Sequence, residues 1–302
     1  MSATVIHEPA ESGYARWLTV IGDLVEDVVV WTARDVVTGT DNPARVIRTR
    51  GGSAANVAAL AAPLVPTRFV GAVGDDGIGY QLVEQLRRLG VDPRVTHTGT
   101  TGCVVVIVDP TAERTMFPDR AAAGMLGPVS AADIAETAIL HLPAYGFLTP
   151  IVAGSITAAA ADVHHRGGAV SIDISATSVV DAFGIDEFRR LLGEIRPEYV
   201  FANADEAAML RLGSEPPPSG CVYILKRGAG PASVVADDGT ILDVPAIAVP
   251  GARDTTGAGD AFAAGFLAGR ISGSDLADSC RQGHRLAASV LLRPGAGGQV
   301  GT

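Results

Sequence analysis

Hydrophobic and polar positions follow two different patterns along this chain, one in its first part and one in the remainder. In its first part, short apolar or alternating runs predict strands at 17–22, 28–31, 44–49, 67–71, 94–98, 102–108 and 113–117. Two helices, predicted at 53–62 and 77–89, interrupt these strands. From about residue 138 onward, strands and helices alternate regularly. The second pattern predicts an α/β fold with a mainly parallel sheet and helices on both faces.

The regular part sets where a ligand would bind. Its strands are predicted at 138–142, 169–173, 199–202, 221–225, 232–236 and 240–244. Its helices are predicted at 150–164, 185–193, 204–211, 257–270 and 274–291. Ligands of doubly wound sheets bind beyond the carboxyl ends of the strands. We therefore look for chemistry at the residues that directly follow each strand.

Composition narrows the class of protein. A chain of 302 residues with 47% hydrophobic residues can bury one large core, and we expect a single domain over 1–302. The formal net charge of −10 argues against a nucleic-acid partner. Three widely spaced cysteines, no signal-peptide pattern and no apolar run of membrane-spanning length favour a cytoplasmic protein without a membrane partner.

The segment 254–262 (Asp-Thr-Thr-Gly-Ala-Gly-Asp-Ala-Phe) is the most informative motif. Glycines permit a tight bend at the start of a helix, and such a bend aims several backbone N–H groups at one point. These N–H groups form a site for an anion. Asp260 would lie beside that anion, where a carboxylate is suited to act as a general base.

A second glycine motif occupies 51–56 (Gly-Gly-Ser-Ala-Ala-Asn) and leads into an alanine-rich helix. Taken alone, the turn is typical of tight packing. Asn56, however, offers both hydrogen-bond donors and an acceptor, which a ligand rich in hydroxyl groups requires.

The two motifs, in this order and about two hundred residues apart, resemble the signatures of the PfkB-type carbohydrate kinases, the ribokinase-like family. The resemblance implies a central sheet flanked by helices and covered by a small β lid, which we place in insertions at about 27–50 and 94–120. It also implies that Asp260 is the catalytic base and that the backbone of Gly257, Ala258 and Gly259 forms the anion hole.

The resemblance also assigns the sugar end of the site. Asp27 lies five residues after Gly22 and matches a family carboxylate that accepts hydrogen bonds from the sugar. Gly51, Gly52 and Asn56 match the family's contacts to sugar hydroxyls. Ser53 stands where ribokinases proper carry lysine, which favours a substrate other than ribose.

At the nucleotide end, the resemblance implies that ATP and Mg²⁺ are bound. Asn203 and Glu206 match the family's Asn-x-x-Glu, in which Asn lies near the phosphates and Glu organises the magnesium through water. The same spacing also suits an ordinary helix cap. Lys226, Gly228 and Gly230 follow a strand where the family contacts the nucleotide, and a plain hairpin turn is the competing interpretation.

Some members of the family bind a monovalent cation such as K⁺ beside the anion hole. The positions that match their ligands in this chain are Asp254, Thr256, Val290, Arg293 and Gly295.

The resemblance therefore implies a kinase that transfers the γ-phosphoryl group of Mg-ATP to a hydroxyl group, with a primary alcohol as the expected acceptor. Its substrate would be a small sugar or nucleoside, and ribose, fructose, 2-keto-3-deoxygluconate, adenosine and pseudouridine all stay open. A noncatalytic ligand-binding or regulatory member of the fold is the main alternative. A nicotinamide-dependent dehydrogenase is disfavoured because the glycine spacing over 71–79 is wrong. Free edges of the lid strands favour a homodimer.

Overall fold

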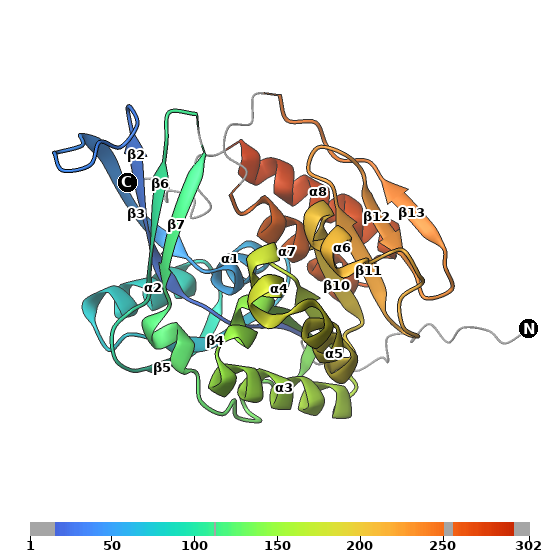
Figure 1. Cartoon of the computed structure of the whole chain (residues 1–302). Coiled ribbons are helices and arrows are strands. Elements are labelled where there is room, and N and C mark those ends of the chain that lie inside the picture. Colours follow the sequence, from blue (N-terminus) through green and yellow to red (C-terminus); the bar gives the residue numbers. More distant parts are fainter. Residues whose placement is uncertain (1–15, 112, 251–255, 293–302) are drawn as a thin grey trace, which may run out of the picture.

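The computed structural model describes residues 16–111, 113–250 and 256–292. Nine strands of this part form one sheet in the order β13-β12-β11-β10-β9-β8-β1-β4-β5 (Figure 1). Neighbouring strands are parallel except β11–β12 and β12–β13. The strands are β1 (Trp17–Ile21), β4 (Thr67–Val73), β5 (Asp92–His97), β8 (Thr137–Pro143), β9 (Ala169–Asp173), β10 (Tyr199–Asn203), β11 (Val222–Lys226), β12 (Ala232–Val235) and β13 (Ile241–Val244). The predicted mainly parallel sheet is confirmed.

Helices cover both faces of this main sheet. Alternate residues of a strand point to opposite faces. Phe69 and Val73 of β4 accordingly belong to one hydrophobic cluster, and Val70 and Ala72 to another. The first cluster includes residues of α1 (Ser53–Ala61), α2 (Gly77–Arg88), α7 (Ala258–Ile271) and α8 (Leu276–Leu291). The second includes residues of α3 (Pro150–His165), α4 (Thr177–Phe183), α5 (Ile185–Ile195) and α6 (Ala204–Leu210).

A second sheet has four strands in the order β3-β2-β6-β7 and projects from the main body (Figure 1). Its strands are β2 (Val25–Thr32), β3 (Ala44–Gly51), β6 (Cys103–Val108) and β7 (Arg114–Asp119). We call it the lid sheet. The strand expected at 94–98 was assigned to the lid, and that assignment is wrong. It is β5, which pairs in parallel with β4 at the edge of the main sheet.

The physical reason lies in the connection. The unit β4–α2–β5 is a parallel crossover, and the helix returns the chain to the sheet it has just left. As an edge strand, β5 exposes polar residues such as Arg94, so its sequence resembles a half-solvated lid strand. The second contribution to the lid sheet therefore begins at β6.

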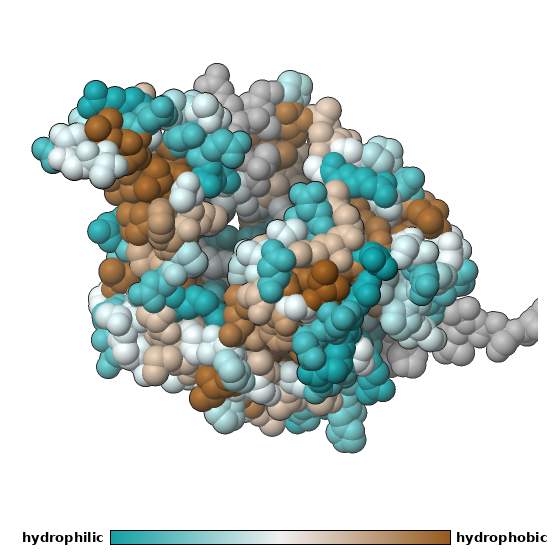
Figure 2. All heavy atoms as spheres, viewed as in Figure 1, coloured by the Kyte–Doolittle hydropathy of each residue, from teal (hydrophilic) through white to brown (hydrophobic). Residues whose placement is uncertain are grey.

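The lid sheet carries apolar side chains on its surface. Val46 of β3 and Met116 and Phe117 of β7 are each more than half exposed, and Figure 2 shows hydrophobic residues gathered on this sheet. The homodimer expected through the lid stays a prediction. None of the helices within 16–111, 113–250 and 256–292 is long and apolar enough to span a bilayer.

Candidate active site

The candidate site lies at the carboxyl edge of the main sheet. Asp173 ends β9, Asn203 ends β10 and Lys226 ends β11. Asn203 and Lys226 are direct partners in the parallel register of β10 and β11. Because parallel strands end together at one edge, three polar residues that are distant in sequence are brought into one row.

Asp260 joins the two glycine motifs. It lies in the first turn of α7, three residues after the N-cap Gly257, which adopts a left-handed φ of 75°. Ser53 Oγ donates to Asp260 Oδ1 at 2.7 Å, and Asn56 Nδ2 donates to Asp260 Oδ2 at 3.0 Å. Both donors stand at the start of α1. The predicted anion-hole segment and the predicted sugar motif therefore meet at one carboxylate.

The electrostatic surroundings favour a basic carboxylate. Burial raises the pKa of Asp260 above its usual value, and nearby Asp173 raises it further. The hydrogen bonds from Ser53 and Asn56 and the charge of Lys226 act in the opposite direction on this pKa. A carboxylate with a raised pKa accepts a proton more readily than an ordinary one, as general-base chemistry requires.

The paired glycines of the second motif are required by close packing. A Cβ on Gly51 would lie 1.9 Å from Asp27 Oδ1, and a Cβ on Gly52 would lie 2.2 Å from the Asp23 carbonyl oxygen. Gly52 also has φ of 97°, where side chains are strained. The glycines thus let the end of β3 approach β2 and bring Asp27 beside the motif.

Asp27 and Arg50 lie together at the end of the site where the sequence predicts the sugar. Burial is the largest effect that raises the pKa of Asp27, to about 6; Arg50 lowers it and Asp260 raises it. Burial is also the largest effect on Arg50, whose pKa it lowers to about 10, while Asp260 and Asp27 raise this pKa. Arg50 Nη2 donates to Asn56 Oδ1 at 3.2 Å. One buried cation therefore lies among two carboxylates and the motif asparagine.

Lys226 supplies positive charge beside the anion-hole segment. Its Nζ donates to Asp173 Oδ2 at 2.6 Å, and a Cβ on Gly259 would lie 3.5 Å from the same Nζ. Desolvation lowers the pKa of Lys226, but Asp173, Glu206 and Asp260 together raise it above the usual value. Lys226 is therefore held as a cation next to the first turn of α7.

Asn203 and Glu206 form a capping box at the start of α6. The Asn203 side chain accepts from the Glu206 backbone N–H at 2.9 Å, and Glu206 Oε2 accepts from the Asn203 backbone N–H at 2.8 Å. Asn203 Nδ2 also donates to Glu206 Oε1 at 2.7 Å. The capping interpretation is confirmed. The contact of Glu206 with magnesium through water stays a prediction.

Other predicted site residues are placed less tightly. Gly228 and Gly230 lie in the turn after β11, where the Gly230 N–H donates to the Arg227 carbonyl, so the turn is confirmed and the nucleotide contact stays a prediction. Asp254, Arg293 and Gly295 lie outside the described residues. Thr256 is half-buried and Val290 is buried in α8. Within the described ranges, no three His, Cys, Asp or Glu side chains gather into a metal site.

Sequence reasoning missed four residues that belong to the cluster. Ser53 was noticed only as a replacement for lysine, although it donates to Asp260. Asp173 ends a predicted strand, and that position could have marked it. Tyr145 lies among the carboxylates, and burial with Asp260 and Asp173 raises its pKa to about 12. Arg50 could not be recognised from the sequence around it. Arg48 is also an arginine of the same strand but is exposed, so the local pattern does not show which of the two is buried.

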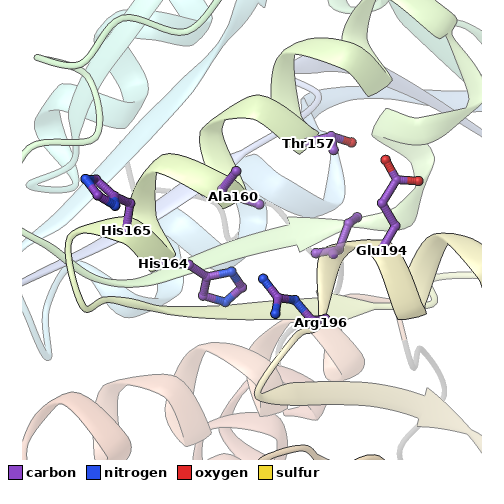
Figure 3. A pocket seen from close by; sticks show the side chains of 8 residues that line it. Thr157, Ala160, His164, His165, Glu194 and Arg196 are labelled. Atoms are coloured by element: carbon purple, nitrogen blue, oxygen red, sulfur yellow. The ribbon is translucent and has the colours of Figure 1, made fainter.

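A separate hollow lies elsewhere. A cavity of about 500 Å³ is lined by α3 and the end of α5, and Figure 3 shows His164 and Arg196 side by side there. Glu198, which pairs with His164 at 3.1 Å, directly precedes β10. The hollow is therefore at the amino edge of the main sheet and contains none of the predicted site residues.

Comparison with known proteins shows the family of the chain. A model of the pfkB family carbohydrate kinases matches residues 17–301. The chain belongs to the pfkB carbohydrate kinase family. By class it is a phosphotransferase that acts on sugars or nucleosides, and membership implies use of ATP. The predicted family is confirmed.

Individual relatives differ in substrate. The ATP-dependent ribose-1-phosphate kinase of Halopiger xanaduensis is 29% identical over 82% of this chain and 81% of its own length. The 2-dehydro-3-deoxygluconokinase of Dickeya dadantii is 30% identical, but the match spans 41% of this chain and only 37% of that protein. Among solved structures, a probable sugar kinase from Rhizobium etli superposes with TM-score 0.83 at 25% identity, over 95% of this chain and 96% of that one. The pfkB relatives thus support a sugar or nucleoside kinase and leave its substrate open.

Proposed function

We propose that the protein transfers the γ-phosphoryl group of Mg-ATP to a hydroxyl group, most simply a primary alcohol, of a sugar or nucleoside. One observation carries the proposal. Asp260 is held by Ser53 and Asn56 in the first turn of α7, directly after the backbone of Gly257, Ala258 and Gly259. A base and an anion-binding helix start at one point are what phosphoryl transfer to an alcohol needs.

The chemistry follows from these groups. Asp260 takes the proton of the acceptor hydroxyl, and the hydroxyl oxygen bonds to the γ-phosphorus. The bond between the γ-phosphorus and the bridging oxygen breaks, and ADP leaves with that electron pair. Within the part of the chain that the structure describes, each carboxylate oxygen of Asp260 accepts one hydrogen bond, so a lone pair is left for the proton.

Charge at the phosphate end is balanced by the backbone N–H groups of 257–259 and by Lys226, which lies beside Gly259. Magnesium, when bound with the nucleotide, would neutralise part of the phosphate charge, and Glu206 would orient its water ligands. Potassium at the site that includes Thr256 and Val290 is an additional expectation, and the assay below includes it.

The acceptor end favours an uncharged, hydroxyl-rich substrate. Asp27 and Asn56 offer acceptors and a donor for hydroxyl groups. Both arginines at this end face carboxylates: Arg120 makes a bidentate contact with Asp23 at 2.7 and 2.8 Å, and Arg50 lies among Asp27 and Asp260. The positive charges of Arg120 and Arg50 are thus already balanced by carboxylates before a substrate phosphate could bind. We therefore place an unphosphorylated sugar or nucleoside ahead of a sugar phosphate.

The proposal is tested by ADP release from Mg-ATP with a panel of free sugars, sugar acids, sugar phosphates and nucleosides, with and without K⁺. Turnover of at least one acceptor by the wild-type protein is expected. Asp260→Asn should lower kcat by roughly a hundredfold to ten-thousandfold, because it removes the base while keeping the shape. Asp186→Asn is the matched control, since Asp186 also lies in the first turn of a helix, α5, and is exposed.

Two results would count against the proposal. An Asp260→Asn variant with unchanged kcat would exclude Asp260 as the base. A wild-type protein that binds ATP but turns over no acceptor in the panel would favour the noncatalytic alternative.

A further inference from the structure

A buried arginine beside the candidate base has no place in the mechanism above. Arg50 stands at the end of β3 and is 5% exposed. Its Nε is buried and, among the described residues, has no hydrogen-bond partner. Burying a cation with incomplete hydrogen bonding costs stability, so hydrophobic residues would serve packing better at this position. The energetic cost points to a functional reason for Arg50.

The one side-chain hydrogen bond that Arg50 makes to a described residue supplies that reason. Arg50 Nη2 donates to Asn56 Oδ1, and Asn56 Nδ2 donates to Asp260 Oδ2. The reversed amide would turn Asn56 Nδ2 toward the guanidinium donors and Oδ1 toward the carboxylate, and both contacts would be repulsive. A charged donor on one side and a charged acceptor on the other therefore permit only one amide orientation.

We propose that Arg50 is a positioning residue for phosphoryl transfer: through Asn56 it fixes the Asp260 carboxylate in place, and its charge keeps that carboxylate ionised. This inference rests on the proposed function in that Asp260 acts as the base. The other ionisable groups that face Asp260 are the same in every Arg50 variant. They are Asp27, Asp173, Lys226 and Tyr145. Differences between those variants therefore report on Arg50 itself.

Two substitutions separate geometry from charge. Arg50→Met removes both, and Arg50→Lys retains the charge without the planar guanidinium. Arg50→Met should lower kcat by roughly tenfold to a hundredfold, since a misplaced reactive group has an effect of that order. The acid limb of its kcat/KM profile should move to higher pH, because loss of a nearby cation favours the protonated carboxyl. Arg50→Lys should keep the wild-type acid limb while kcat stays below the wild-type value.

Arg48→Met is the matched control. Arg48 lies on the same strand two residues earlier, its side chain is 63% exposed, and it pairs with Glu26. The control should show the wild-type kcat and the wild-type acid limb. A purely structural role for Arg50 would change thermal stability and leave the acid limb where it was.

A second measurement needs no turnover. Protein labelled with ¹³C at the aspartate carboxyl groups is titrated by NMR, and the Asp260 signal is assigned from its loss in Asp260→Asn. In Arg50→Met that signal should titrate at higher pH than in wild type and in Arg48→Met. If no acceptor is ever phosphorylated, the proposed function fails, yet this titration still tests the coupling of Arg50 to Asp260.

Three outcomes would overturn the inference. One is an Asp260 titration that is the same in Arg50→Met and wild type. Another is a wild-type kcat in Arg50→Lys, which would show that the planar guanidinium is not needed to position Asp260. This variant can be measured even if Arg50→Met fails to fold. The last is an Arg50→Met variant whose KM for an acidic acceptor rises while kcat and the acid limb stay unchanged. That result would show that Arg50 contacts the substrate and does not position Asp260.

Discussion

The two edges of the main sheet both carry ionisable side chains, but those at the carboxyl edge are buried and those at the amino edge are exposed to solvent. At the carboxyl edge, Asp173 is 7% exposed and Glu206 is 2% exposed, and Lys226 is held between them and Asp260. At the amino edge, Glu194 and Arg196 are exposed, and His164 and Glu198 form a partly solvated pair. Solvent screens the amino edge and is largely excluded from the carboxyl edge.

The difference shows that hollow volume does not identify the site. The amino edge has cavities of about 500 and 1020 Å³, and neither is lined by any of the predicted site residues. The carboxyl edge instead retains buried charges that oppose folding unless they are paired. Charges that are expensive to bury, gathered where parallel strands end, mark the candidate active site.

The largest expected effect is on the free energy of unfolding, and it differs between a buried ion pair at the carboxyl edge and an exposed ion pair elsewhere. Lys226→Met leaves Asp173 buried without its cation, so the free energy of unfolding should fall by about 3 kcal/mol or more. Arg166→Met breaks an exposed pair with Asp162 in α3 and should change it by less than about 0.5 kcal/mol. Urea denaturation at neutral pH measures both. Equal losses in the two variants would remove the energetic distinction between the edges.

A smaller effect of opposite sign is expected at Asp27. Its pKa is raised to about 6 in the folded protein, above the usual 3.8, mainly by burial. The folded state therefore binds this proton more tightly than the unfolded state, and ionisation of Asp27 lowers stability as pH rises from about 4 to 6. Asp27→Asn removes this penalty and should raise the free energy of unfolding by about 2 kcal/mol at pH 7.5.

The gain in Asp27→Asn should shrink as pH falls from 7 toward 5, because wild-type Asp27 then becomes protonated. Denaturation curves at both pH values test this, with the exposed Asp35→Asn as control. The same substitution should weaken acceptor binding, with KM rising roughly tenfold or more. A variant that is no more stable at pH 7.5 than wild type would show that Asp27 is not under electrostatic strain.

The smallest effect is expected at the amino edge. Arg196 ends α5 with φ of 54°, a left-handed conformation that glycine adopts more easily. Arg196→Gly should therefore raise the free energy of unfolding by up to about 1 kcal/mol and leave kcat and KM unchanged. Arg190→Gly, in the middle of the same helix, should instead lower stability by about 1 kcal/mol. Loss of turnover in Arg196→Gly would give the amino edge a role in function.

Local features of the sequence were enough to predict most of the architecture. Apolar periodicity located nearly all strands and helices, although α4 was missed. The capping box of Asn203 and Glu206 was one of the two interpretations drawn from the sequence, and its contacts are made within three residues. The backbone hydrogen bonds of helices and their caps join residues close in sequence, so their pattern can be recognised there.

The charged centre depended on contacts that no local pattern contains. Lys226 meets Asp173, Ser53 meets Asp260, and Arg50 of the lid sheet reaches Asn56 at the start of α1. The membership of β5 in the main sheet likewise depended on its pairing with β4. The sequence by itself determined the family, the layers and the two glycine motifs. Only the tertiary structure decided which charges are buried together, because burial of a charge depends on every element packed around it.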